Sequence, residues 1–193
     1  IPDGVGNIAY VAFSGCSSLT SITIPDSVRW IGYSAFKDCD SLTTITVSEN
    51  NAIYTDIDGV LFSKDAATIL AYPAGKTEDS YVIPDGVTNI GGDAFYRCSA
   101  LTTITIPDGV TSIGYSAFGD CDSLTTITVS ENNASYTDID GVLFTKDAAT
   151  ILVYPAGKAE DAYVIPDGVT NIGDDAFYHC SALTTIRSEE RRV

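Results

Sequence analysis

The sequence predicts an α/β solenoid, in which short strands and short helices recur along a stacked array. Two observations lead to this prediction. Residues 24–105 return without a gap as residues 106–187, and these two stretches of 82 residues differ at only 12 positions. Within them, a pentapeptide Ile-Pro-Asp-Gly/Ser-Val recurs at intervals of 23, 59, 23 and 59 residues, beginning at Ile1, Ile24, Ile83, Ile106 and Ile165. Periods of this size are typical of repeat architectures.

The unit 24–46 shows how one coil is expected to form. Ala35, Phe36 and Cys39 lie at positions i, i+1 and i+4. This spacing places apolar side chains on one face of a helix of about one to two turns. Ser34 stands where it could cap that helix.

A strand is expected to follow the helix. Leu42, Ile45 and Val47 have the spacing of a strand whose apolar side faces inward, so Thr44 and Thr46 point outward. Prolines directly follow such strands and are expected to end them, at Pro25, Pro84, Pro107 and Pro166.

Two segments of 36 residues, 47–82 and 129–164, depart from the regular unit. Residues 60–62 and 69–72 form strand-like apolar runs around the polar stretch 63–68, which predicts a β-hairpin. Each insert either contributes one enlarged coil or projects from the edge while the solenoid continues.

The regular unit, I-P-x-x-V-x-x-I-G-x-x-A-F-x-x-C-x-x-L-x-x-I-x, resembles the 23-residue leucine-rich repeat of BspA-like bacterial surface proteins. Five copies match, with Ala9 replacing glycine in the first. The resemblance implies one right-handed leucine-rich repeat solenoid over residues 1–193. Its regular repeats would be 1–23, 24–46, 83–105, 106–128 and 165–187, with hairpin-containing units at 47–82 and 129–164.

Composition narrows the function. The chain has 26 acidic and 10 basic residues and a formal charge of −16, which disfavours binding to nucleic acid and anionic membranes. No apolar run approaches the ~20 residues of a membrane span, and no signal segment opens the chain. The sequence starts at Ile1 within a repeat and lacks methionine, so we expect a fragment or mature piece whose targeting segment is missing.

The cysteines all occupy the same place in the unit, Ala-Phe-x-x-Cys, at positions 16, 39, 98, 121 and 180. One cysteine per coil favours an inward column of free thiols, which pack as small apolar groups. Disulfides and metal sites need other spacings.

Candidate chemical sites are few, and we predict neither catalytic residues nor a metal or other cofactor. Asp56 and Asp58, repeated as Asp138 and Asp140, resemble the start of a calcium loop, but the fifth and twelfth ligands are missing. Turn formation is the favoured interpretation, with calcium binding left open. His179 beside Cys180 suggests a base and a nucleophile, but its counterpart in the preceding copy is Arg97, which favours a solvent-facing loop.

Other motifs carry little weight. Asn133-Ala134-Ser135 is a formal glycosylation acceptor, which usually means nothing in a bacterial protein. Nothing singles out a carboxylate pair for glycoside hydrolysis.

Two surfaces are candidate partner-binding sites. The first consists of the outward threonines of the strands, which would form an uncharged, hydroxyl-rich sheet: Thr44, Thr46, Thr103, Thr105, Thr126 and Thr128. The alternative is that threonine serves β propensity alone. The second is Arg29 and Trp30, which become Thr111 and Ser112 in the other copy and are therefore expected to be exposed, beside Tyr10 and Tyr33. Lys37, which becomes Gly119, belongs to the same class of differences at turns and outer faces.

These features predict a non-catalytic binding module whose partner is a protein. The family resemblance implies a secreted or cell-surface protein of a host-associated bacterium, acting in adhesion to host extracellular-matrix or surface proteins. Two alternatives stay open: a structural spacer that presents another domain, and an accessory module of a carbohydrate-active enzyme.

Overall fold

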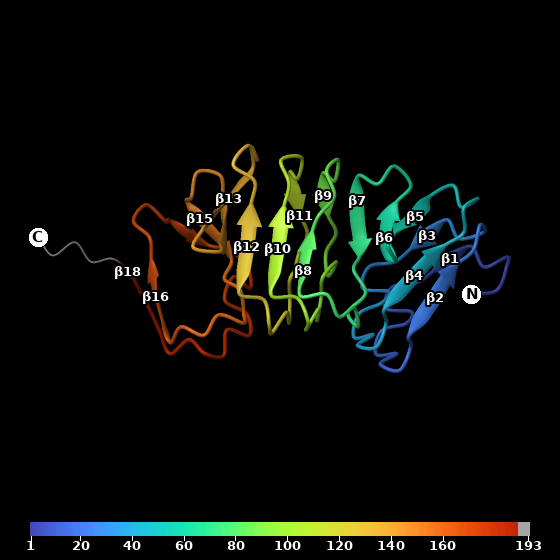
Figure 1. Ribbon diagram of the computed structural model, residues 1–193, viewed down its shortest axis with the longest axis horizontal. Coiled ribbons are helices and arrows are strands. Elements are labelled where there is room, and N and C mark those ends of the chain that lie inside the picture. The colour runs from blue at the N-terminus through green and yellow to red at the C-terminus, as the bar shows by residue number, and fades with distance from the viewer. Residues whose placement is uncertain (189–193) are drawn as a thin grey trace, which may run out of the picture.

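A computed structural model describes residues 1–188, and strands are the only regular secondary structure in that range. Seven long strands lie along an elongated stack, with residue 1 at one end and β18 at the other (Figure 1). They are β2 (Ser21–Ile24), β4 (Thr44–Val47), β8 (Ser80–Val82), β10 (Thr103–Ile106), β12 (Thr126–Val129), β16 (Ala162–Ile165) and β18 (Thr185–Ser188). The chain is thus a β-solenoid.

Short strands make a second set. They are β1 (Asn7–Ile8), β3 (Trp30–Ile31), β9 (Asn89–Ile90), β11 (Ser112–Ile113) and β17 (Asn171–Ile172). Regular coils pair in parallel and in register, so that Ile104 faces Ile127 and Thr103 faces Thr126. The inward isoleucines of β4, β10 and β12 are fully buried, as the alternating pattern predicts.

The prediction of short helices, and with it the α/β class, is wrong. The stretch after each short strand is a run of tight turns. Ser34 and Asp38 adopt left-handed φ angles of 56° and 58°, so only residues 35–37 lie between them. Three residues are fewer than the 3.6 of one helical turn.

In the turns of the coil 83–105, alternate backbone N–H groups bind the next coil, and those between them bind carbonyl oxygens three positions back. The N–H groups of Asp93, Phe95 and Arg97 donate to carbonyl oxygens of residues 115, 117 and 119 at 3.1, 2.8 and 2.9 Å. A helix would direct the same donors to residues four positions back. The apolar spacing correctly predicted burial, since Ala35 and Cys39 are inside, but not the backbone conformation.

Each insert is an enlarged coil that contains an antiparallel three-stranded sheet. The strands are β5 (Tyr54–Ile57), β6 (Val60–Ser63) and β7 (Thr68–Ala71), repeated as β13 (Tyr136–Ile139), β14 (Val142–Thr145) and β15 (Thr150–Val153). The predicted hairpin is β6–β7. Strand β7 also pairs in parallel with β9, and β8 pairs with β10, so the insert supplies both strands of a coil. The alternative in which the insert projects from the edge is wrong.

The tight turn between β5 and β6 interrupts the row of long strands. The N–H of Ile45 in β4 donates to the carbonyl oxygen of Gly59 at 2.9 Å, and a Cβ on Gly59 would lie 3.1 Å from Thr44. Gly141 contacts β12 in the same way. The long strands therefore form three separate ladders, β2–β4, β8–β10–β12 and β16–β18, and the expectation of one broad threonine sheet is corrected.

The cysteines are all free, as predicted. The thiols of Cys39 and Cys121 donate to backbone oxygens of the preceding coil at 3.1 and 2.9 Å, and Cys98 is buried in the same core cluster as Cys121. Cys180 is partly buried, and Cys16 in the first coil is exposed, which departs from the inward column.

This difference predicts selective labelling. Burial raises the pKa of the Cys180 thiol to about 11 and also raises that of Cys39 and Cys98, so little thiolate forms at pH 8. We expect one thiol per chain to react rapidly with a disulfide reagent under native conditions and five to react in denaturant without reductant. Cys16→Ser should remove the rapid phase; a count below five in denaturant would contradict the free-thiol assignment.

Candidate functional site

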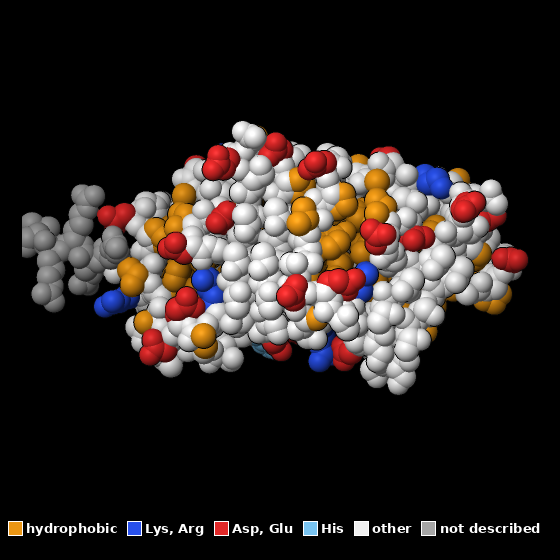
Figure 2. Space-filling model, in the orientation of Figure 1, with side chains coloured by type: hydrophobic (Ala, Val, Ile, Leu, Met, Phe, Trp, Pro, Cys, Tyr) orange, Lys and Arg blue, Asp and Glu red, His pale blue; other side chains and the backbone are white. Residues whose placement is uncertain are grey.

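The threonines of β10 and β12 form the most regular surface of the molecule, here called the Thr ladder: Thr103, Thr105, Thr126 and Thr128. Thr103 faces Thr126 and Thr105 faces Thr128 across the parallel pair. Figure 2 shows a stretch over these two strands that is largely free of charged and hydrophobic side chains, between two regions over the inserts where hydrophobic side chains gather. Within residues 1–188, the hydroxyls of Thr103, Thr105 and Thr128 find no hydrogen-bond partner in the protein.

A second row of threonines has a structural role. The hydroxyl of Thr102 donates to the backbone oxygen of Asp79 at 2.9 Å, and that of Thr125 donates to the oxygen of Thr102 at 3.2 Å. These hydrogen bonds connect one coil to the next. In each repeated Thr-Thr pair, the hydroxyl of the first threonine therefore binds the preceding coil and that of the second faces outward.

The other predicted site residues lie apart from the Thr ladder. Thr44 and Thr46 belong to the ladder β2–β4, which the Gly59 turn separates from β8. Trp30 lies in β3, in a different sheet, with Arg29 exposed beside it. The Trp30 side chain is 39% exposed and packs edge-on to Tyr10, with ring centroids 5.0 Å apart.

The aspartates that resemble a calcium loop have backbone roles. One carboxylate oxygen of Asp56 accepts the N–H of Val47 at 2.6 Å, and Asp138 does the same for Val129 at 2.8 Å. Asp58 has a left-handed φ of 51° in the turn. Over residues 1–188 no group of three or more His, Cys, Asp and Glu side chains is arranged to hold a metal ion.

His179 lies on the surface, as the sequence comparison suggests. Its ring stacks on Tyr178 with centroids 4.3 Å apart, and Nδ1 lies 2.8 Å from a carboxylate oxygen of Asp120. The thiol of Cys180 instead donates to the backbone oxygen of Tyr154, so the histidine does not activate it.

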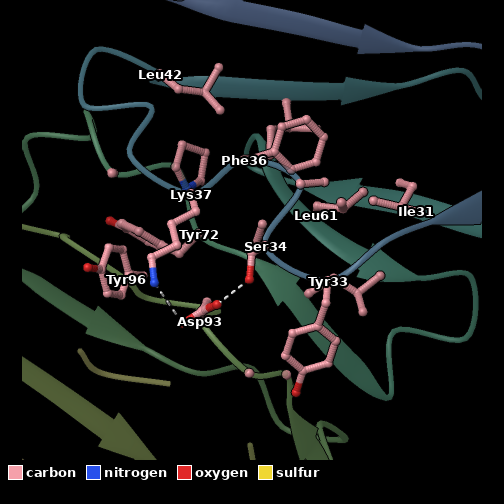
Figure 3. A pocket seen from close by; sticks show the side chains of 18 of the residues that line it. Ile31, Tyr33, Ser34, Phe36, Lys37, Leu42, Leu61, Tyr72, Asp93 and Tyr96 are labelled. Carbon is pink, nitrogen blue, oxygen red and sulfur yellow. Dashed lines mark hydrogen bonds and ion pairs between the residues drawn. The ribbon is translucent and has the colours of Figure 1, made fainter. Parts of the chain in front are cut away.

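Two equivalent pockets were not predicted from the sequence. Each opens where an insert meets the turn segments of the regular coils on either side. The first has a volume of about 120 Å³ and lies between residues 31–37 and 91–96 (Figure 3). The second has a volume of about 340 Å³ and lies between residues 113–119 and 173–178. Their walls coincide under the 82-residue offset, except for Ile45 in the first and Thr145 in the second.

A family model described as the BspA type leucine-rich repeat region matches residues 1–70, 74–152 and 159–192, in six copies. The chain belongs to this family. BspA-type repeats thus account for both the regular coils and most of the inserts, which agrees with the resemblance found in the sequence.

Solved structures of three bacterial proteins share the fold. A leucine-rich cell surface protein from Faecalibacterium prausnitzii A2-165 is 32% identical with a TM-score of 0.73, and the match covers 99% of this chain and 53% of that one. The pneumococcal vaccine antigen PcpA is 26% identical with a TM-score of 0.70, covering 95% and 42%. A repeat protein from Eubacterium ventriosum ATCC 27560 is 24% identical with a TM-score of 0.67, covering 97% and 53%.

This BspA-type chain spans about half or less of the length of these proteins. No curated protein matches it. Among residues 1–188, no helix has the length and apolar character needed to cross a membrane. Leucine-rich repeats of this type are generally non-catalytic, protein-binding modules, and the family match includes no catalytic family.

Proposed function

We propose that the chain is the protein-binding module of a secreted or cell-surface protein, that it adheres to host extracellular or surface proteins, and that the Thr ladder is its principal contact surface. The observation that carries the proposal is the set of outward hydroxyls held in register on β10 and β12, of which those of Thr103, Thr105 and Thr128 have no hydrogen-bond partner within residues 1–188. Each hydroxyl both donates and accepts a hydrogen bond, so the ladder suits the polar backbone and side chains of a protein partner.

Two further observations support a surface role. One similar structure is that of a cell surface protein, and another is that of a vaccine antigen. The charge of −16 disfavours nucleic acid as the partner, as the composition indicates. A structural spacer would need neither an ordered polar surface nor its unpaired hydroxyls.

Lysine substitutions on the ladder test the proposal. Thr103→Lys and Thr128→Lys each place a long charged side chain on the contact surface, while a solvent-facing change costs little stability. Against purified host matrix and plasma proteins on a binding array, we expect each change to weaken capture at least tenfold and to leave the Tm within about 2 °C. Thr46→Lys, at an exposed position, reports whether the separate ladder β2–β4 participates.

The controls separate the two candidate surfaces. Thr77→Lys adds the same charge at an exposed loop position that is Ala159 in the other copy, and it should bind normally. Trp30→Ala and Arg29→Ala should also bind normally. If these two changes abolish capture while the ladder variants retain it, the contact surface lies around β3. If none of the arrayed proteins is captured by the unmodified chain, the adhesive function is wrong.

A further inference from the structure

One of the wall residues that differ between the two pockets is positively charged. Lys37 extends from the turn of its coil across the first pocket, towards Tyr96 and Asp93 (Figure 3). Its ammonium nitrogen lies 3.9 Å from the centroid of the Tyr96 ring and 4.0 Å from a carboxylate oxygen of Asp93. An aromatic face and a carboxylate together form a favourable site for a primary ammonium. The protein thus fills its first pocket with its own lysine side chain.

The second pocket keeps the groups that receive this cation and lacks the cation. Tyr178 and Asp175 are the counterparts of Tyr96 and Asp93, and Gly119 replaces Lys37. Asp174, which replaces a glycine, adds a second carboxylate. The described side chains that line this pocket include no lysine or arginine.

Two differences accompany the larger volume of about 340 Å³. Ala71 becomes Val153 and Gly92 becomes Asp174, and both of these changes add atoms to the second wall. The second pocket instead lacks the Lys37 side chain, and its Tyr115 hydroxyl donates to Asp175, whereas the Tyr33 hydroxyl lies over Gly92 in the first pocket. Ligand pockets typically begin at about 300 Å³, so the second pocket has room for a ligand and the first does not.

The neighbouring coil explains why glycine stands at the second position. A Cβ on Gly119 would lie 3.0 Å from the ring of Tyr96, which belongs to the preceding coil. Tyr96 itself donates to a carboxylate oxygen of Asp120 at 2.5 Å and is held there. A side chain at position 119 would therefore begin in close contact with the Tyr96 ring. The second pocket keeps an aromatic ring and a carboxylate, with Tyr178 stacked on His179 and one oxygen of Asp175 accepting the hydroxyl of Tyr115 at 2.5 Å.

We propose that the second pocket binds a primary ammonium on a linear alkyl chain, with the chain in the apolar cavity and the ammonium between Tyr178 and Asp175. The source is a lysine side chain of a partner or a free aliphatic amine. The acidic surface favours the approach of such a cation. This site is separate from the Thr ladder, so the proposal does not depend on the adhesive function.

Titration with n-butylammonium, which reproduces the lysine side chain, tests the proposal. We expect one saturable site per chain by calorimetry at low salt, with NMR shifts at residues lining the second pocket. Butanol has nearly the same chain without the charge and should bind at least about fivefold more weakly, since the cation contributes about 1 kcal/mol or more. Equal binding of butanol would overturn the cation site.

Matched variants locate the site. Gly119→Lys should fill the pocket and abolish binding, whereas Gly119→Ala introduces the same Cβ contact and should retain it. Asp175→Asn should weaken binding about fivefold or more, while Asp26→Asn removes the same charge from an exposed turn elsewhere and should not. Lys37→Gly should open the first pocket and raise the stoichiometry to two. Binding that survives Gly119→Lys would reflect general attraction to the acidic surface and would refute the proposal.

Two peptides distinguish the sources of the ammonium. An acetylated, amidated Gly-Lys-Gly peptide presents the ammonium on a chain, and its Gly-norleucine-Gly counterpart lacks the charge. Binding of the lysine peptide, lost in Gly119→Lys, identifies the site as a receptor for partner lysines. Binding of butylammonium alone identifies it as a receptor for free amines.

Discussion

Replacement of Asn51 by leucine is expected to destabilise the fold by roughly 3–6 kcal/mol, because it removes a buried hub of four hydrogen bonds. The Asn51 side chain is fully buried. Its amide nitrogen donates to the backbone oxygens of Pro25 and Val28 at 2.8 and 3.1 Å. Its oxygen accepts the N–H groups of Ile53 and Tyr54, both at 2.9 Å. Leucine has a similar volume but would remove the partner of the Ile53 and Tyr54 N–H groups and of the Val28 oxygen, while the Pro25 oxygen would keep the N–H of Val28 at 3.2 Å.

Urea unfolding followed by circular dichroism measures this effect. Asn50→Leu alters the exposed neighbour and should change the free energy of unfolding by no more than about 0.5 kcal/mol. Asn133→Leu should reproduce the large loss, since Asn133 makes the same four bonds to Pro107, Val110, Ser135 and Tyr136. A loss below about 1 kcal/mol at both sites would show that these bonds are replaced by water.

These contacts also explain why the sequence misleads at Asn133. The sequence makes Asn133 a formal glycosylation acceptor, but the side chain is fully buried and its nitrogen donates to two backbone oxygens. Each insert needs this asparagine to join its first turn to the Pro-x-x-Val turn of the preceding coil. The partners lie 26 and 23 residues away, so no local pattern marks them.

In the fold, too, features set by local spacing were predictable, and features set by partners on another coil were not. Period and burial follow from spacing, because Ile45, Ile104 and Ile127 recur on the inward side of β4, β10 and β12. The helix prediction failed because Ala35, Phe36 and Cys39 have a spacing that suits a helix and a chain of tight turns alike. The partners of alternate backbone donors decide between these conformations, and those partners lie on the next coil.

Less of the candidate site than of the fold could be predicted from the sequence. The outward threonines follow from alternation along the strand, whereas the gaps between their ladders depend on where Gly59 and Gly141 pack. The pockets form between segments about 60 residues apart and leave no motif. One signal was present: the change from Lys37 to Gly119, in copies that differ at only 12 positions, marks the residue that fills one pocket and leaves the other open.

A second large loss is expected at Phe95, where alanine should cost about 3–5 kcal/mol. The side chain is fully buried in the central hydrophobic cluster. Its ring stacks between Tyr72 and Phe118, with centroids 5.4 and 5.5 Å away, and lies 5.8 Å from Tyr81. Truncation therefore opens a cavity against two rings of the insert and one ring of the following coil.

The same substitution at Phe177 is the matched control, because Phe177 has the equivalent position in the last regular coil. Its ring keeps the contacts to Tyr154 and Tyr163, at 5.4 and 5.9 Å, but it is only half-buried, and within residues 1–188 no further ring stacks on it as Phe118 stacks on Phe95. In a solenoid each coil is stabilised mainly by its neighbours. We therefore expect Phe177→Ala to cost about half as much as Phe95→Ala. Hydrogen exchange should show the loss at Phe177 confined to the C-terminal ladder β16–β18, whereas Phe95→Ala should lower protection in β8, β10 and β12 together. Equal losses at the two positions would show that the last coil is as tightly packed as the centre, contrary to the nearest-neighbour account.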